Sequence, residues 1–290
     1  MDERAALRVI DELVAEAGDD AAFIDGLAIA TDMLHAETDY PSGVTSYTVG
    51  WRTIAVSLSD LAAVGAIPMA TLAVYAPVQF EEIELSAFVE GASEVSALVG
   101  ARYVGGDLDT TSELTTVGIA LGRTTQPVTR NGARVGDAIV VSGTLGRGAL
   151  GVKYLEGGDV ERGNKSFRFT PRVETGMYLA THATSMIDSS DGLARSLHQL
   201  AEASGVGMAI ERQPLPIDER LTDVADGEWS VEELGLYWGE DFELVATLPA
   251  ELAGAVLDGA PADLTKIGEV VPEGVSIDGE ALPDRGYTHG

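Results

Sequence analysis

Five short loops in this chain place aspartates in otherwise apolar sequence, and any fold must provide partners for them. The loops are GDDAAF, IATDML, SLSDLAAVGA, YVGGDLDTT and MIDSSDGLA, and the aspartates concerned are Asp19, Asp20, Asp32, Asp60, Asp107, Asp188 and Asp191. A carboxylate that leaves water among apolar residues is costly unless a positive group meets it. Hard divalent cations such as Mg²⁺ prefer oxygen ligands. We therefore expect the fold to gather these loops around several Mg²⁺ ions, with a polyphosphate bound to them.

A single aspartate is a weak signal here because the whole chain is acidic. It has 47 Asp and Glu against 18 Lys and Arg, and a formal net charge of −29. Acidic stretches in polar surroundings, such as residues 218–220 and 223–228, read as solvated surface. For any one loop, a helix N-cap or a turn explains the aspartate equally well. Only the five loops taken together favour the metal interpretation.

Composition excludes several classes of protein. A chain of 290 residues, 45% of them hydrophobic, can form one large or two ordinary domains and is not disordered. It has no run of about eighteen apolar residues that would span a membrane, and its acidic N-terminus lacks a signal-peptide pattern. Cysteine is absent, which excludes disulfides, thiolate metal sites and cysteine nucleophiles. We expect a cytoplasmic location.

The basic residues indicate the solvent in which the protein works. Lysine occurs only at Lys153, Lys165 and Lys266, and arginine supplies the other basic residues. At molar salt the Debye length is about 3 Å, so the self-repulsion of a very acidic surface is screened. The composition therefore predicts a halophile protein that needs molar salt to stay folded. The same charge makes nucleic acids and anionic membranes unsuitable partners.

Apolar periodicity and turn residues divide the first part of the chain into alternating helices and strands. Asp25 and Gly26 are a hairpin signal between two strands. The stretch from Arg123 to Gly136 is polar and turn-rich, so we expect domains over residues 1–130 and 131–290. The expected helices of the first domain cover residues 2–18, 45–64 and 81–99, and its strands cover residues 21–24, 27–33, 69–78, 103–105 and 114–122.

The second domain repeats the alternation, which predicts an α/β (α+β) protein of two domains. A polar loop is expected over residues 156–162. Expected strands cover residues 138–142, 206–210, 242–247 and 265–270, and expected helices cover residues 145–155, 173–183, 192–203 and 251–259.

Two further patterns allow more than one interpretation. Residues 146–151 match the dinucleotide fingerprint G-x-G-x-x-G, but no isolated acid ends a strand about twenty residues later, so a tight strand-to-helix turn is favoured. Lys153 is not placed as in a Walker A loop, so any ATP site lacks a P-loop. Glu240 and Asp241 precede an apolar strand, and they indicate either a strand-edge turn or a carboxylate pair for a cationic substrate.

Taken together, the motifs resemble those of the thiamine-monophosphate kinases, which belong to the aminoimidazole ribonucleotide synthetase-like superfamily. GDDAAF, TDM, SLSDLAAVGAIP, GGDLDTT, TRNGARVGD, SGTLGRGALG, IDSSDGLA and GEDFELV occur in the family's order over nearly the whole chain. The lack of cysteine disfavours the selenophosphate synthetases and the hydrogenase maturation proteins of the same superfamily. The resemblance implies a two-domain fold whose N-terminal sheet domain dimerises, with ATP and Mg²⁺ in the cleft.

The resemblance also implies roles for single residues. Glu240 is implied as a contact of the thiamine substrate. Gly106, Arg130 and Ser190 are implied as ATP contacts. The implied magnesium ligands are Asp20, Thr31, Asp32, Asp60, Asp107, Asp188 and Asp191, whereas Asp19 is expected to be a turn or cap residue.

Two positions depart from the family pattern, and both concern the phosphate acceptor. The family usually has a histidine seven residues after the TD aspartate, where this chain has Asp39, with His35 closer to the motif. An aromatic residue near the family's C-terminus falls here at Asp284, and Tyr287 is the candidate to replace it.

The implied reaction is in-line, Mg²⁺-assisted transfer of the γ-phosphoryl group of ATP to thiamine monophosphate. A phosphate acceptor with a second pKa of about 6 is largely ionised at neutral pH, so no general base is needed. The residues then serve to position two anions and to hold the metal ions that neutralise them. Two alternatives stay open: a cyclo-ligase like aminoimidazole ribonucleotide synthetase, and a non-catalytic Mg²⁺-ATP-binding protein.

Overall fold

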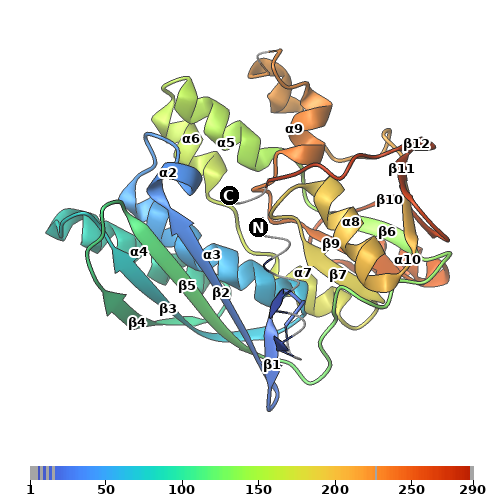
Figure 1. Cartoon of the computed structure of the whole chain (residues 1–290), viewed down its shortest axis with the longest axis horizontal. Helices are drawn as coiled ribbons and strands as arrows, with labels where there is room; N and C mark the ends of the chain where they lie inside the picture. The colour runs from blue at the N-terminus through green and yellow to red at the C-terminus, as the bar shows by residue number, and fades with distance from the viewer. Residues whose placement is uncertain (1–5, 7–8, 11–12, 15–16, 226, 288–290) are drawn as a thin grey trace.

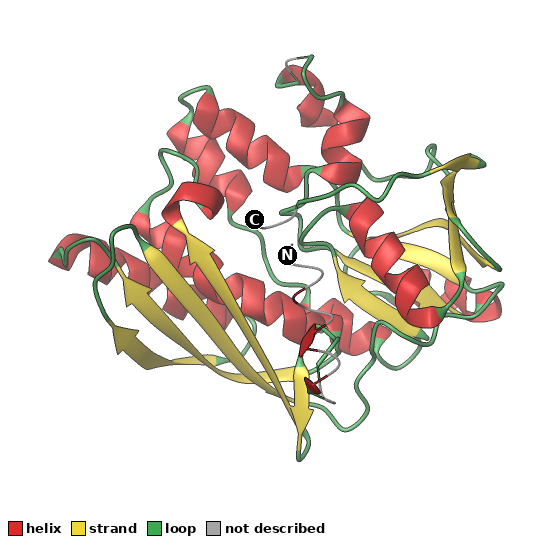
Figure 2. Ribbon diagram, viewed as in Figure 1, coloured by secondary structure: helices red, strands yellow, loops and turns green. Residues whose placement is uncertain are grey.

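The computed structural model describes residues 6, 9–10, 13–14, 17–225 and 227–287 and has two α/β units side by side (Figure 1). The expected helix over residues 2–18 lies mostly outside the described residues. Figure 2 shows the two sheets on opposite sides of the molecule, with helices between and around them. Among the described residues, no helix is both long and apolar enough to cross a membrane.

The first unit is a five-stranded sheet in the order β1-β2-β5-β3-β4, with helices on one face. Asp25 and Gly26 have positive φ angles of 50° and 78°, as the tight β1–β2 hairpin requires. The strands are β1 (Ala22–Ile24), β2 (Leu27–His35), β3 (Ile67–Ala76), β4 (Arg102–Leu108) and β5 (Thr115–Arg123), and the helices are α2 (Ala36–Asp39), α3 (Ser46–Ala63) and α4 (Glu82–Leu98).

Helix α3 is the centre of the molecule, and nearly all of its residues are buried. Helix α3 packs on β2 and β5, on α4, and on the second unit. Because each of its sides is buried, each side carries mostly apolar residues. A Cβ atom at Gly118 of β5 would lie 1.8 Å from the carbonyl oxygen of Thr53, so only glycine lets α3 lie this close to the sheet. This contact holds the middle of α3 against β5.

The second unit is a seven-stranded, mostly antiparallel sheet in the order β12-β11-β8-β10-β6-β9-β7. Helix α8 covers one face, and α7 and α10 cover the other. The strands are β6 (Ala138–Ser142), β7 (Ser185–Asp188), β8 (Gly207–Ile210), β9 (Leu244–Leu248), β10 (Leu264–Val271), β11 (Val275–Ile277) and β12 (Glu280–Ala281). The helices are α5 (Arg147–Glu156), α6 (Val160–Phe167), α7 (Val173–Leu179), α8 (Leu193–Ser204), η1 (Glu219–Asp223), α9 (Val231–Tyr237) and α10 (Ala250–Gly259).

The two units share one hydrophobic core where α7 lies against α3. Ala62 and Ala63 of α3 pack with Val173 and Leu179 of α7, and Gly176 lets the two helix backbones approach. The C-terminal half of α3 is thereby placed next to the end of β7. Two elements that carry predicted metal ligands are thus neighbours because of apolar packing.

The expected two-domain α/β architecture is confirmed. The sheets use residues 22–123 and 138–281, while the division at residue 130 stays a prediction. The expected loop over residues 156–162 is partly wrong, because Asp159 accepts a hydrogen bond from the Arg162 N–H and starts α6. The expected strand over residues 242–247 begins only at Leu244, since Phe242 has a φ of 53°.

Candidate functional site

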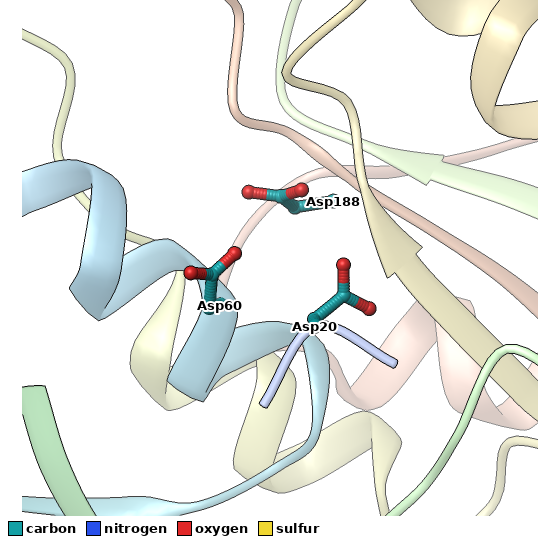
Figure 3. A group of neighbouring side chains, drawn as sticks. All are labelled: Asp20, Asp60 and Asp188. Carbon is teal, nitrogen blue, oxygen red and sulfur yellow. The ribbon is translucent and has the colours of Figure 1, made fainter. Parts of the chain in front are cut away.

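Three of the predicted metal ligands meet at the junction of the two units. Asp20, Asp60 and Asp188 each place a carboxylate oxygen within 4.8 Å of the other two, and their side chains point toward one another (Figure 3). Asp20 precedes β1, Asp60 lies in the last turn of α3, and Asp188 ends β7. We call these three residues, with Asp32, the carboxylate cluster.

Asp32 joins the cluster from β2. It accepts a hydrogen bond of 3.0 Å from the Ser57 hydroxyl, and its charge raises the pKa of the neighbouring Asp60. Ser59 Oγ, one residue before Asp60, donates to Asp188 over 2.5 Å. The S-L-S-D segment of α3 therefore supplies one carboxylate and two hydroxyls, each hydroxyl orienting a carboxylate from another element.

The cluster is electrostatically unfavourable on its own. Burial raises the pKa of Asp60 well above its ordinary value, and the neighbouring Asp32 and Asp188 raise it further. Burial, followed by the charge of Asp20, raises the pKa of Asp188 to about 8. Burial also raises the pKa of Asp32. A divalent cation would relieve this repulsion, and an all-oxygen donor set is the kind that Mg²⁺ binds.

Asp20 gives a specific sign of a missing positive partner. Its Oδ1 accepts a hydrogen bond of 2.7 Å from Arg130 Nη2, whereas its Oδ2 is buried and has no hydrogen-bond partner. A buried carboxylate oxygen without a partner is costly, and a metal ion would satisfy it. Asp19 is different: it accepts hydrogen bonds from the N–H groups of Asp20 and Arg130, as expected for a turn residue. The donor set present in the cluster thus fits Mg²⁺.

Asp107, another predicted ligand, lies away from the cluster. The sheet register aligns Asp32 with Gly118, Gly118 with Ala73, and Ala73 with Gly106, so Asp107 lies three strands from Asp32, roughly 14 Å across the sheet. Asp107 aligns with Val74, on the face turned away from α3. Within one chain, Asp107 is therefore not brought to the carboxylate cluster.

Thr31 and Gly106 have structural contacts of their own. Thr31 Oγ1 donates a hydrogen bond of 3.0 Å to the Gly118 carbonyl, and its side chain lies on the exposed face of the sheet. A Cβ atom at Gly106 would lie 1.6 Å from the carbonyl oxygen of Ala73, so glycine is required where β4 approaches β3.

The loop after β7 leads from the cluster to a pocket. The Ser190 carbonyl accepts a hydrogen bond of 2.6 Å from the Glu240 N–H, and the Asp191 carbonyl accepts one of 3.2 Å from the Tyr287 N–H. Asp191 is outside the group of three close carboxylates. Burial is the main cause that raises the pKa of Tyr287, and the charges of Asp39, Glu240 and Asp191 raise it further. The Asp191 backbone is thus tied to the C-terminal segment that carries Tyr287, a residue of the pocket wall.

The pocket has a volume of about 400 Å³ and combines aromatic rings with two carboxylates. Glu240 and Asp39 are its acidic residues, and Tyr287 comes from the C-terminal segment. The other lining residues are Thr38, Pro41, Val152, Phe167, Trp229, Tyr237, Trp238 and Gly286. Aromatic faces and carboxylates together suit a flat organic cation.

The two departures from the family pattern fall at different places. Asp39 borders the pocket, where one of its oxygens accepts a hydrogen bond of 2.7 Å from the His35 N–H. Asp284 instead forms an ion pair of 3.2 Å with Arg195 and does not line the pocket, whereas the aromatic side chain of Tyr287 does.

Sequence reasoning overlooked Arg52, a buried residue of α3 whose guanidinium pairs with the Glu240 carboxylate. Its Nη1 donates a hydrogen bond of 2.8 Å to the Phe167 carbonyl, and its guanidinium lies 3.8 Å from the centre of the Phe167 ring. A signal was present, because Arg52 and Asp60 are the only charged residues in the expected helix over residues 45–64.

The structure also resolves the two ambiguous patterns. Both Asp241 oxygens accept hydrogen bonds from the start of α5, 2.7 Å from the Gly146 N–H and 2.9 Å from the Gly148 N–H. The N–H groups that would bind a dinucleotide phosphate are thus occupied, and the turn interpretation is confirmed. Burial raises the pKa of Asp241 to about 7. Asp241 is a helix cap, whereas Glu240 borders the pocket.

Family models and known proteins match this geometry over nearly the whole chain. Residues 18–124 match the AIR synthase related protein N-terminal domain, and residues 134–279 match the corresponding C-terminal domain. A thiamine-monophosphate kinase of Halobacterium salinarum is 50% identical, with 100% of both chains covered. One of Methanospirillum hungatei is 38% identical, with 100% of this chain and 99% of the relative covered.

Solved structures agree with these relatives. A structure described as AaThiL complexed with AMPPCP and TMP has a TM-score of 0.90 and 28% identity, covering 100% of this chain and 97% of the other. The hydrogenase maturation protein HypE of E. coli has a TM-score of 0.69 at 22% identity, which shows a common fold only.

Proposed function

This chain belongs to the thiamine-monophosphate kinases of the AIR synthase related proteins, and from that premise we propose how its residues carry out the reaction. The chain is an enzyme that uses ATP to phosphorylate thiamine monophosphate. The full-length identity of 50% to the Halobacterium salinarum kinase carries this conclusion. The acidic composition, with a net charge of −29, and this relative together support a halophilic source.

The carboxylate cluster is proposed as the magnesium site, with Asp20, Asp32, Asp60 and Asp188 as ligands. Bound Mg²⁺ would supply positive charge that neutralises the phosphates, because the repulsion between two anions is the main obstacle to this reaction. Asp60 is central because Asp32 and Asp188 approach it from both units. Asp191 is proposed as a ligand on the side of the pocket, at the other end of the same loop.

Arg130 and Ser190 are proposed to contact ATP beside the cluster. The Arg130 guanidinium is held 2.7 Å from Asp20, and its planar fork suits phosphate oxygens. Ser190 lies between Asp188 and Asp191, so a nucleotide bound to the cluster would pass this loop. Gly106, Thr31 and Asp107 remain proposed contacts that one chain does not bring to the cluster.

The aromatic pocket is proposed to bind the thiamine end of the acceptor. Glu240 and Asp39 place negative charge beside aromatic rings, which suits a thiazolium cation. The acceptor phosphate would then point along the 188–191 loop toward the cluster. This arrangement supports in-line transfer between two phosphates without a general base.

A homodimer through the first sheet is proposed as the working state. The face of this sheet opposite α3 carries no helix among the described residues (Figure 1), and it exposes apolar side chains. Met33, Ile67 and Val104 are 56%, 59% and 53% exposed. An apolar sheet face of this kind is typical of a protein interface. Because Asp107 lies on the same face, we propose that it joins a site only when two copies pair.

The cytoplasm remains the proposed location, supported by the absence of cysteine.

One experiment tests the function. The protein is incubated in molar KCl with ATP, Mg²⁺ and thiamine monophosphate, and thiamine diphosphate is measured. Formation of thiamine diphosphate is expected. ATP use that depends on formylglycinamidine ribonucleotide would instead indicate the cyclo-ligase, and binding of Mg²⁺-ATP without turnover would indicate a non-catalytic protein.

A further inference from the structure

We propose that Arg52 is a positioning residue for thiamine monophosphate, which acts by holding the Glu240 carboxylate at the wall of the aromatic pocket. The inference rests on the proposed binding of the thiamine end in this pocket. It concerns a residue of the N-terminal unit that acts on an acceptor site built largely from the C-terminal unit.

Arg52 is held on every side. Its side chain is only 1% exposed, and its Nη1 is bound to the Phe167 carbonyl. The guanidinium lies 3.8 Å from the ring centre of Phe167, 5.5 Å from that of Phe169 and 5.4 Å from that of Phe242. A planar cation between aromatic rings has little freedom to rotate. The direction in which Nη2 meets Glu240 is therefore set by the core.

Glu240 is held from the other side by its backbone. Its φ of 64° is rare for a residue with a side chain, and its N–H donates to the Ser190 carbonyl. Gly148 of α5 packs directly against it, since a Cβ atom there would lie 2.5 Å from the Glu240 Cβ. The Glu240 side chain is 28% exposed and borders the pocket. Backbone and ion pair together fix a carboxylate that still faces the ligand space.

Packing alone would not require an arginine at this position. Burying a guanidinium among aromatic rings has a large desolvation cost, and an apolar side chain of similar volume often serves a core equally well. The Nε atom of Arg52 is buried without a hydrogen-bond partner, which adds to that cost. What the ion pair provides in exchange is a Glu240 carboxylate fixed in direction.

Helix α3 also connects this ion pair to the carboxylate cluster. Asp60 follows Arg52 by eight residues, so the two lie about 12 Å apart along the helix axis. The same rigid, buried helix therefore carries Arg52, which holds the Glu240 carboxylate near the acceptor's cation. It also carries Asp60, the proposed metal ligand near the acceptor's phosphate. The ion pair thereby sets the acceptor's position relative to the metal ligands.

The experiment is a double-mutant cycle on the full chain in molar KCl, with both Michaelis constants measured. Arg52→Met removes the charge but keeps an apolar side chain. It is expected to raise the KM for thiamine monophosphate about tenfold to a hundredfold, with the KM for ATP changed less than about twofold. Arg52→Lys is expected to be intermediate, because it keeps the charge without the planar fork. In a Glu240→Gln background, Arg52→Met should add less than about twofold.

Arg172→Met is the matched control, because Arg172 forms a similar ion pair of 2.5 Å with Glu243, which does not border the pocket. It should leave the KM for thiamine monophosphate unchanged. A wild-type KM for thiamine monophosphate in Arg52→Met, an equal rise in both Michaelis constants, or full additivity with Glu240→Gln would overturn the inference. If Arg52→Met does not fold, the same criteria apply to Arg52→Lys. Absence of thiamine diphosphate formation by the wild type would instead overturn the proposed function.

Discussion

Replacement of Asp60 by asparagine should stabilise the metal-free protein while it removes most of the activity. Asparagine keeps the shape and the hydrogen-bonding capacity of the side chain but removes its charge. Asp20, Asp60 and Asp188 have carboxylate oxygens within 4.8 Å of one another, so that charge is unfavourable unless a cation is bound.

The size of the effect follows from these distances. Two unit charges 4.8 Å apart repel by roughly 3 kcal/mol at an effective dielectric constant of about 20. The variant loses this repulsion with Asp188, and the lost repulsion with Asp32 acts in the same direction, while Asp20 is partly neutralised by Arg130. A gain of about 3 kcal/mol would raise the melting temperature by roughly 5 °C for a chain of this size.

The pH decides whether the gain is visible. The pKa of Asp188 is raised to about 8 from 3.8, so the folded metal-free protein binds protons that the unfolded chain has released. The contribution of Asp188 to the stability of the metal-free wild type is therefore fully present below pH 3.8 and is lost as the pH rises to about 8. The advantage of Asp60→Asn should be greatest above pH 8, where the cluster of the wild type is ionised.

The assay is a thermal melt at fixed molar KCl, with and without Mg²⁺, at a pH of about 6 and about 9. Mg²⁺ at about a hundredfold excess over its Kd should stabilise the wild type by about 2.7 kcal/mol and the variant by less, so the advantage of the variant should shrink. Turnover at saturating Mg²⁺ should fall about a hundredfold or more.

Glu90→Gln on the exposed side of α4 makes the same charge change far from the cluster and should show neither effect. A metal-free variant that melts below the wild type at the higher pH, or near-wild-type turnover, would refute the reasoning.

Three further predictions concern the same site and the solvent. Arg130→Ala should raise the KM for ATP several-fold more than that for thiamine monophosphate, and equal changes in steady-state assays would contradict its proposed contact with ATP. Asp107→Asn and Asp188→Asn should both weaken ATP binding about tenfold or more in titration calorimetry; an unchanged Kd in both would count against the site. Because the net charge is −29, the melting temperature should fall steeply as KCl is reduced from molar to about 0.1 M, and full stability at low salt would be evidence against halophilic adaptation.

Much of the fold could be predicted from local sequence, because the signals were local. The hairpin at Asp25 and Gly26, the apolar helix ending near Gly65 and the polar stretch after Arg123 each follow from a few neighbouring residues. The short helix α2 and the start of α6 were missed because they depend on single capping contacts, such as that of Asp159. The strand β9 begins two residues later than expected because Glu240 and Phe242 adopt positive φ angles, which the local sequence does not predict.

The candidate site could be predicted only in part for a different reason. Aspartates in apolar surroundings indicated the cluster, and the spatial meeting of Asp20, Asp60 and Asp188 agrees with that signal. Asp107 shares the signal, yet the sheet register places it on another face, and register depends on pairings between distant strands. Arg52 was overlooked because its importance comes from Phe167 and Glu240, which are far away in the sequence.

The shared core of α3 and α7 has a consequence for the time at which the enzyme becomes active. During synthesis, residues 17–123 can form a sheet and present Asp20, Asp32 and Asp60 well before Asp188 has left the ribosome. Only when Val173 and Leu179 pack on Ala62 and Ala63 is β7 brought to these carboxylates. A nascent or truncated chain therefore does not assemble the carboxylate cluster, which requires both units to have folded and docked.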